Sequence, residues 1–411
     1  MIECGTRIDN SSGYESLCSM STVVAAASSA PLAGKTLRVV IVDDAVVVRS
    51  LMTRWISAES DMRIVASLCS GRKALTFIER NTADVVVLDI DMPDLDGIST
   101  LRSLLQKRRG LVVIMVSTLT RRSAEISFRA LSLGAADYIP KPDSAREVST
   151  SLSFRRELIE KIRILGHNRQ SRRRHAAVGG PGTATTPPPE SYSARGRRSS
   201  VADETGAPAR LRRFTNIAPR ALLVGASTGG PQALMAIVEK LAPAIDCAPL
   251  LIAQHMPPTF TVVLAEHLSR VSGRRAHEAD DGEPVRAGEI YVAPGGRHMR
   301  VVNDCDGVKI ALGDDPPINF CRPAVDALFA SAAAVWGAGS LAIILTGMGA
   351  DGALGAEDIV AAGGSVIAQD EETSVVWGMP RSVAEAGLCS AVLPLDVIAP
   401  KIVHLFSGVR P

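Results

Sequence analysis

The chain has 411 residues, 46% of them hydrophobic, which is enough for two or three globular domains that each bury a core. Its formal net charge of +2 favours no class of charged partner, and its seven cysteines form no C-x-x-C pair, so we expect reduced thiols, a cytoplasmic protein and no zinc site. The apolar runs are too short to span a bilayer and the N-terminus is acidic, which excludes a signal peptide and direct membrane insertion.

Residues 1–34 are rich in serine, alanine and glycine and show no sustained hydrophobic period. We therefore predict a disordered N-terminal extension without a function of its own. Met20 is a candidate for the true start of the protein.

Residues 35–165 alternate short apolar runs with amphipathic segments. Five such repeats are typical of a doubly wound parallel sheet, in which functional residues lie at the carboxyl ends of the strands. The predicted strands are 37–42, 63–66, 85–88, 112–116 and 138–139.

Polar residues stand at the ends of these predicted strands. Asp43 and Asp44 follow the first strand and Asp89 follows the third. Three carboxylates at one edge would repel each other unless a hard cation such as Mg²⁺ joined them. Ser117 and Lys141, after the fourth and fifth strands, would then receive the oxygens of a phosphoryl group placed on a carboxylate.

This arrangement resembles the receiver domain of two-component response regulators over residues 37 to about 145. The resemblance implies a flavodoxin-like fold that is phosphorylated with the help of Mg²⁺. The roles that it implies are phosphoacceptor for Asp89, metal ligands for Asp43, Asp44 and Asp89, switch residues for Ser117 and Tyr138, and contact with the phosphoryl group for Lys141.

Residues 166–219 hold ten arginines, no lysine and three acidic residues, with abundant serine, glycine and proline. Such a segment cannot form a core, so we predict a flexible linker. A nucleic-acid-binding arm is the alternative. The segment has only two aromatic residues and no helix-turn-helix pattern follows it, so we expect no nucleic-acid partner.

Residues 220–411 show the pattern of a second doubly wound, Rossmann-like α/β domain. Glycine-marked or polar turns follow most of its apolar runs. The predicted strands are 222–224, 250–253, 290–292, 341–345, 366–368 and 391–393.

Three polar residues in this domain each follow a predicted strand. Ser227 lies in a G-x-S-x-G turn between a strand and a helix, His255 follows the next strand, and Asp351 lies in a glycine-rich turn. At one sheet edge they can act as nucleophile, general base and orienting carboxylate. Their chain order differs from that of α/β-hydrolases, and a structural or phosphate-binding glycine turn is the alternative for the serine motif.

Two further hypotheses stay open. Gly347, Gly349 and Gly352, with Asp370 downstream, form a dinucleotide fingerprint that would make the domain an NAD-binding oxidoreductase, although such fingerprints usually open a domain. A catalytically silent two-component scaffold would keep the same fold. A DNA-binding output would need a basic reading helix, which residues 220–411 do not offer.

Five motifs of this domain are similar to those of the chemotaxis protein-glutamate methylesterases, and the similarity covers both domains in that family's order. The motifs are residues 225–231, 254–256, 293–299, 346–352 and 369–371. The resemblance implies that Ser227 attacks the methyl ester of a receptor glutamate, that His255 takes the serine proton, that Asp351 orients the histidine, and that Thr228 and Met348 flank the oxyanion site.

The resemblance also implies a phosphorylation-activated enzyme that deamidates receptor glutamines and needs no cofactor for its ester hydrolysis. The implied partners are methyl-accepting chemotaxis receptors and a chemotaxis histidine kinase, and we expect a monomer. Cys321 stands where that family commonly has histidine, and we expect this difference to affect local packing only. His298 lies in one of the motifs, but a lone loop histidine is more often structural.

Overall fold

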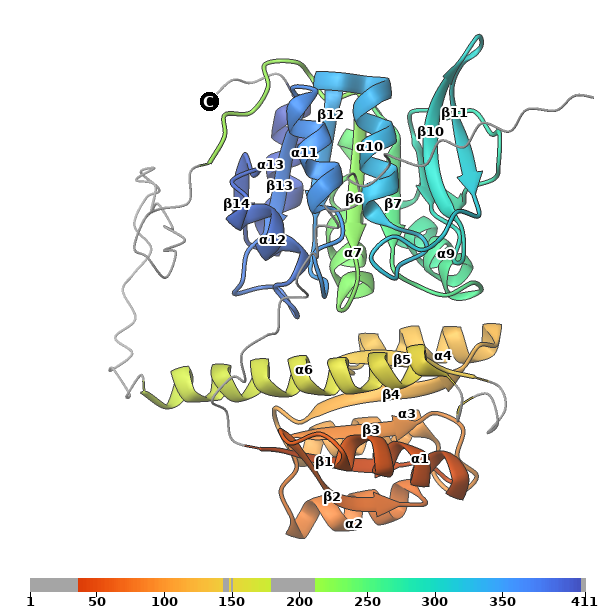
Figure 1. Cartoon of the computed structure of the whole chain (residues 1–411), viewed down its shortest axis with the longest axis vertical. Helices are drawn as coiled ribbons and strands as arrows, with labels where there is room; N and C mark the ends of the chain where they lie inside the picture. Colours follow the sequence, from red (N-terminus) through yellow and green to blue (C-terminus); the bar gives the residue numbers. More distant parts are fainter. Residues whose placement is uncertain (1–35, 143–147, 149–150, 179–210, 408–411) are drawn as a thin grey trace, which may run out of the picture. The chain divides into compact units, whose positions relative to one another are not determined.

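The computed structural model describes residues 36–142, 148, 151–178 and 211–407. The predicted N-terminal extension and most of the predicted linker lie outside these residues. The described part contains a five-stranded sheet, a seven-stranded sheet and a two-stranded hairpin (Figure 1).

The first sheet confirms the five strands predicted between residues 35 and 165. All its neighbouring pairs are parallel, and the strand order is β2-β1-β3-β4-β5. The order reverses between β1 and β3, so the carboxyl ends of those two strands border the crevice where ligands bind in such sheets. The strands are β1 (Leu37–Val42), β2 (Met62–Leu68), β3 (Val85–Asp89), β4 (Val112–Thr118) and β5 (Asp137–Lys141).

Helices cover both faces of this sheet, which explains why its strands are almost continuously apolar. One face packs against α1 (Val46–Ser57) and α6 (Leu152–Val178). The other packs against α2 (Gly71–Arg80), α3 (Gly97–Lys107) and α4 (Arg121–Ser132). Side-chain oxygens of Ser70, Asp96 and Thr120 cap the first turns of α2, α3 and α4.

Helix α6 continues beyond residue 165, where the sequence predicted that a flexible linker begins. Its extension makes tertiary hydrogen bonds: Asn168 Nδ2 donates to Val375 O at 3.2 Å, and Arg172 Nη2 donates to Ser374 O at 2.6 Å. Such contacts stabilise a helix whose own composition is too polar to form a core. The start of the predicted linker is therefore helical.

The second sheet contains all six strands predicted after residue 220 and one more at its edge. Every pair is parallel, and the order is β14-β13-β12-β6-β7-β9-β8. The order reverses between β12 and β6, so a crevice is expected at their carboxyl ends. The strands are β6 (Ala221–Ala226), β7 (Leu250–Gln254), β8 (Arg275–Glu278), β9 (Glu289–Val292), β12 (Ser340–Ile344), β13 (Ser365–Gln369) and β14 (Ala391–Leu393).

Two groups of helices bury the faces of this sheet. One face packs against α7 (Gly230–Val238), α8 (Ala242–Ile245), α9 (Phe260–Ser272) and α13 (Leu395–Phe406). The other packs against α10 (Val325–Trp336), α11 (Ala353–Ala361) and α12 (Met379–Glu385). None of the helices within the described ranges is long and apolar enough to cross a membrane.

The antiparallel hairpin of β10 (His298–Asp304) and β11 (Gly307–Gly313) was not predicted from the sequence. Its first residue, His298, is fully buried. The ring Nε2 donates to Pro316 O at 3.2 Å, and Nδ1 accepts the N–H of Ala324 at 3.2 Å. Both ring nitrogens are therefore used, and His298 has the structural role that the sequence favoured.

Candidate active site and phosphoacceptor site

Ser227 directly follows β6, in the tight turn that leads into α7. Its N–H donates to Thr346 O at 3.1 Å, and its carbonyl accepts Gly230 N at 2.8 Å and Gln254 Nε2 at 2.9 Å. Gly229 has a φ of 74°, a left-handed conformation that glycine adopts without strain. The backbone of Ser227 is thus fixed, and its partly accessible side chain stands at the carboxyl edge of the sheet.

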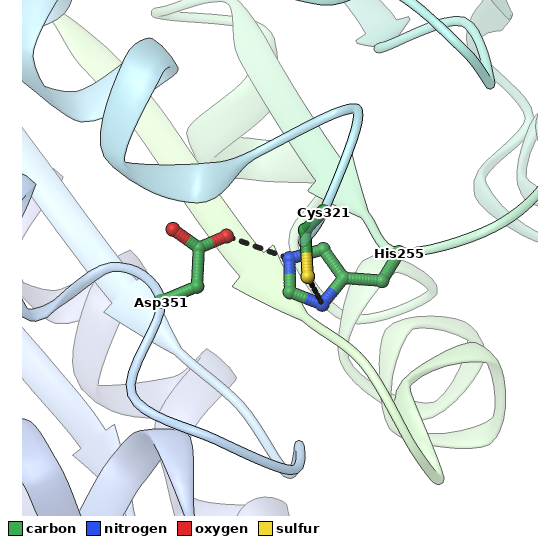
Figure 2. Close-up of side chains that lie close together, drawn as sticks. All are labelled: His255, Cys321 and Asp351. Carbon is green, nitrogen blue, oxygen red and sulfur yellow. Dashed lines mark hydrogen bonds and ion pairs between the residues drawn. The ribbon is translucent and has the colours of Figure 1, made fainter. Parts of the chain in front are cut away.

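His255 and Asp351 come together as the sequence predicted. His255 follows β7, Asp351 lies in the turn after β12, and His255 Nε2 lies 2.6 Å from Asp351 Oδ2 (Figure 2). The carboxylate, which is 2% exposed, also accepts the N–H groups of Val325 at 2.7 Å and Asp326 at 3.1 Å. These donors belong to the first turn of α10, so the positive end of the helix dipole faces the carboxylate.

The two partners shift each other's ionisation. Burial raises the pKa of Asp351, but the hydrogen bond and charge of His255 and the two backbone donors outweigh it and bring the pKa below its ordinary value. Burial lowers the pKa of His255, but hydrogen bonds to Asp351 and Cys321 outweigh it and raise the pKa to about 10. These two contacts therefore make the neutral ring a stronger proton acceptor.

Cys321 contacts the other nitrogen of the same ring. Its Sγ lies 3.4 Å from His255 Nδ1, the nitrogen that Asp351 leaves free (Figure 2). Over the described residues, no hydrogen bond joins His255 to Ser227. The prediction that Cys321 matters only for local packing is wrong, because its sulfur contacts the predicted general base. The structure thus pairs two members of the predicted triad and leaves the role of the serine a prediction.

Thr228 and Met348 lie where the sequence placed them, next to Ser227 and in the turn after β12. Thr228 is buried and its carbonyl accepts Thr346 Oγ1 at 2.9 Å. Met348 is half-buried and packs against an apolar cluster that includes Val376. Their predicted place beside the oxyanion remains a prediction.

The contacts of the glycine-rich loop argue against the dinucleotide hypothesis. The N–H of Gly352 donates to Asp326 Oδ1 at 2.9 Å and to Asp351 Oδ1 at 3.0 Å. A pyrophosphate would have to replace these two carboxylates at this N–H group. The side chain of Asp370 instead closes a local turn, accepting the N–H and hydroxyl of Thr373.

Asp326 is a site residue that the sequence analysis missed. Its Oδ1 accepts the N–H groups of Gly352 and Gly355 at 2.9 and 2.7 Å, so it ties α10 to the loop that carries Asp351. Burial, and then the neighbouring Asp351, raise its pKa to about 6. The available signal was a carboxylate in the first turn of a helix that follows a proline.

The predicted phosphoacceptor site forms at the carboxyl edge of the first sheet. Lys141 Nζ lies 2.8 Å from Asp89 Oδ2 and 3.5 Å from Asp43 Oδ2. Asp89 is 1% exposed, and its Oδ1 has no hydrogen-bond partner in the described part of the chain. Burial raises the pKa of Asp89 to about 7, against the opposing effect of Lys141. The surroundings of Asp89 therefore balance the negative charge of its carboxylate only in part.

These carboxylates fit a hard cation. One oxygen from each of Asp43, Asp44 and Asp89 lies within 4.8 Å of the others. An all-oxygen donor set that includes an unpartnered buried carboxylate oxygen is the kind of site that divalent cations such as Mg²⁺ occupy.

The two predicted switch residues are both buried. Ser117 Oγ lies 3.0 Å from Ser127 Oγ. The ring of Tyr138 stacks on Phe260 of α9, with 4.8 Å between ring centroids and 7° between ring planes. The switch tyrosine therefore contacts the domain that holds Ser227.

Comparison with known proteins accounts for both halves of the chain. Residues 39–153 match the response regulator receiver domain, and residues 222–402 match the CheB methylesterase domain. The protein-glutamate methylesterase/protein-glutamine glutaminase of group 2 operon from Bradyrhizobium diazoefficiens is 58% identical over 380 residues, covering 91% of this chain and 95% of that protein. The protein-glutamate methylesterase/protein-glutamine glutaminase of Azospirillum brasilense is 46% identical over 370 residues, covering 90% and 92%.

Among solved structures, the catalytic domain of the Thermotoga maritima CheB methylesterase is 42% identical, with a TM-score of 0.44; the match covers 46% of this chain and 100% of that one. The receiver match indicates use of a divalent metal in phosphorylation, and the relatives point to chemotaxis signalling partners. The identity to full-length relatives runs through both domains in the same order. The chain therefore belongs to the CheB family of protein-glutamate methylesterases/protein-glutamine glutaminases that carry a response regulator receiver domain.

Proposed function

We propose that this chain hydrolyses methyl esters of glutamates, and deamidates glutamines, on methyl-accepting chemotaxis receptors through an acyl-enzyme on Ser227. The observation that carries the proposal is the contact of His255 with Asp351 at 2.6 Å. Both residues follow strands of one sheet, and strand β6 of that sheet leads to Ser227. A chemotaxis histidine kinase would supply the phosphoryl group that Asp89 accepts, and phosphorylation would raise the esterase rate.

The proposed chemistry gives each polar residue one task. Asp351 holds His255 through Nε2 and stabilises the charged ring. His255 Nδ1 takes the proton of Ser227 Oγ while that oxygen attacks the ester carbonyl, and then gives it to the departing methanol or ammonia. Thr228 and Met348 flank the developing oxyanion, which backbone N–H groups would stabilise. Water then hydrolyses the acyl-enzyme, and we expect no cofactor for this chemistry.

In the receiver, Asp43, Asp44 and Asp89 would hold Mg²⁺. When bound, Mg²⁺ neutralises charge on the phosphoryl group during its transfer. Lys141 already contacts Asp89 and would contact that group as well.

The test is Ser227→Ala in the full chain, assayed for methanol release from receptor membranes that carry labelled methyl esters. Because triad members act as a unit, the rate should fall by several orders of magnitude, and His255→Ala should add little to the loss. Ser407→Ala, at the exposed end of α13, is the matched control and should keep its activity.

Phosphorylation of Asp89 by a small phosphodonor with Mg²⁺ serves as the check that Ser227→Ala is folded. A variant that kept more than about a tenth of the rate would show that Ser227 is not the nucleophile.

A further inference from the structure

The imidazole of His255 has a second nucleophile beside it. Cys321 Sγ contacts Nδ1 at 3.4 Å, and Asp351 Oδ2 contacts Nε2 at 2.6 Å. In Figure 2, dashed lines join the sulfur and the carboxylate to different ring nitrogens. Nucleophile, base and orienting carboxylate are thus joined in one chain of contacts, the arrangement that activates a catalytic thiol.

The same three side chains are also close enough to suggest a metal site. That places the sulfur and a carboxylate oxygen within 4.8 Å of each other, so the cluster is compact. The contact at Nδ1 also suits proton transfer: Nδ1 can take the thiol proton while Nε2–H donates to Asp351.

The turn of residues 318–321 fixes the sulfur and leaves it accessible. The N–H of Ile318 donates to Cys321 O at 3.1 Å, and the N–H of Cys321 donates to Ile318 O at 2.8 Å. Asn319 and Phe320 between them both have positive φ, 49° and 63°. Phe320 is 79% exposed and Cys321 is only partly buried, so a small reagent can reach the sulfur.

We propose that Cys321 is an oxidation site for small peroxides, and that its oxidation switches the esterase off. The thiol proton moves to His255 Nδ1. The sulfur then attacks one peroxide oxygen, so that an S–O bond forms as the O–O bond breaks, and the sulfur is oxidised by two electrons to a sulfenic acid. The hydroxide that leaves takes the proton from His255 and departs as water.

Inactivation follows from the use of one ring nitrogen for two purposes. The proposed function requires His255 Nδ1 to face Ser227, because Asp351 holds Nε2. A sulfenic acid on Cys321 would place an additional oxygen at Nδ1 and compete for it. A thiol reductant restores the original side chain. This switch rests on the proposed function only in its second step, the loss of ester hydrolysis.

The first measurement tests the reactivity of the Cys321 thiol and does not depend on esterase activity. Intact protein is alkylated with iodoacetamide at neutral pH, and the rate at each cysteine is followed by peptide mass spectrometry. Because His255 can take the thiol proton as the sulfur reacts, Cys321 should react about tenfold faster than Cys305. Exposure alone predicts the opposite order, because Cys305 is exposed and Cys321 is partly buried.

The control variant is His255→Gln, which removes the base. It should reduce the rate at Cys321 to that of an ordinary thiol and leave Cys305 unchanged. Cys69 is a useful internal comparison, since Lys73 Nζ lies 3.1 Å from its sulfur and lowers its pKa. Its rate should not depend on His255.

The second measurement treats the protein with hydrogen peroxide, removes the excess, and compares methanol release with that of the untreated sample of the same variant. The wild type and Cys305→Ser should lose at least about nine-tenths of their rate and regain it with dithiothreitol. Cys321→Ser should keep its own untreated rate.

A Cys321 thiol that reacts no faster than Cys305, or equal inhibition of wild type and Cys321→Ser, would overturn the switch. Failure of the proposed function gives a different result: Ser227→Ala would stay active while the alkylation rates remained as expected.

Discussion

Two neighbouring carboxylates at the start of α10 show how local contacts decide ionisation. Asp351 and Asp326 are 2% and 6% exposed, and both accept backbone N–H groups. Asp351 also accepts a hydrogen bond from the ring of His255, and its pKa falls. No such ring contact among the described residues offsets the burial of Asp326, and its pKa rises to about 6. We infer that Asp351 is the charged member and that Asp326 is sensitive to pH.

Asp326→Asn should therefore change how stability depends on pH. Between pH 3.8 and about 6 the folded wild type holds a proton on Asp326 that the unfolded chain releases, so its stability falls as the pH rises through this window. The asparagine still offers an oxygen to Gly352 and Gly355 but does not titrate. The difference in unfolding free energy between variant and wild type should shift in favour of the variant from pH 4 to 6.

Denaturant unfolding at each pH measures this difference. Asp306→Asn, at a side chain that is 80% exposed in the β10–β11 turn, is the matched control. The raised pKa would be contradicted if the difference in unfolding free energy between Asp326→Asn and the wild type did not change with pH. It would also be contradicted if Asp306→Asn showed the same change with pH.

Among the site residues, the sequence predicted those that stand at the ends of strands. It missed those that loops place in the site. Ser227, His255 and Asp351 follow strands that share one edge of the second sheet, and Asp89 ends a strand of the first sheet, so their positions follow from topology. Cys321 reaches His255 because of a turn with two positive φ angles, which its sequence does not signal.

Secondary structure was predictable where its apolar period was strong. Most of the strands that were predicted are almost wholly buried. The missed strand β8 has no apolar run, since its four residues are RAHE, and it is half-exposed at the sheet edge. The extension of α6 depends on hydrogen bonds of Asn168 and Arg172 to residues more than two hundred positions away. Tertiary contacts of this kind leave no local pattern.

Helix α6 is also attached to β5 by a buried lysine. Lys161 Nζ pairs with Asp137 at 3.0 Å and Glu157 at 2.8 Å, and donates to Tyr138 O at 2.7 Å. Burial lowers its pKa, but the two carboxylates outweigh burial and raise the pKa above its usual value. Lys161→Met should destabilise the receiver by about 3–5 kcal/mol, because it leaves the carboxylate of Asp137 buried and unpaired.

Urea unfolding of the full chain would measure this loss in the receiver transition. The double variant Asp137→Asn/Lys161→Met removes both charges and should recover part of the stability. Equal losses in the single and double variants would mean that the unpaired charge is not the cause.

The turn after β12 sets a second constraint, on the backbone next to Ser227. A Cβ on Gly347 would lie 2.3 Å from Met379 Sδ and 3.0 Å from Ser227 Cβ. Gly347→Ala should therefore displace the serine and lower the esterase rate about a hundredfold, because small misplacements of reacting groups are costly. Gly339→Ala, whose Cβ would meet only the flexible side chain of Arg220, is the control and should keep its rate. Equal rates for the two variants, in the methanol-release assay, would show that the turn tolerates a side chain.

At the scale of the whole molecule, receiver residues contact helices α7 and α9 of the esterase domain. Arg121 of α4 pairs with Glu266 of α9 at 2.6 Å, and Gln232 of α7 donates to Leu131 O at 3.3 Å. Tyr138 stacks on Phe260. The predicted switch tyrosine thus belongs to the contact itself, so a change at Asp89 that moves Tyr138 would alter the energy of this interface.

We expect this contact to restrain the unphosphorylated enzyme. Phosphorylation needs to change the interface by only about 1–3 kcal/mol to raise the active population about 5- to 150-fold. Residues 216–411 alone should then hydrolyse receptor esters faster than the unphosphorylated full chain and should not respond to phosphodonor with Mg²⁺.

Charge reversal tests the same restraint inside the intact protein. Arg121→Glu places a like charge opposite Glu266, so it should weaken the contact and raise the basal rate. The double variant Arg121→Glu/Glu266→Arg restores opposite charges and should return to the wild-type basal rate, whereas a general disturbance of α4 would persist in it. If residues 216–411 alone are slower than the unphosphorylated chain, and Arg121→Glu lowers the rate, the receiver supports catalysis through this contact and does not restrain it.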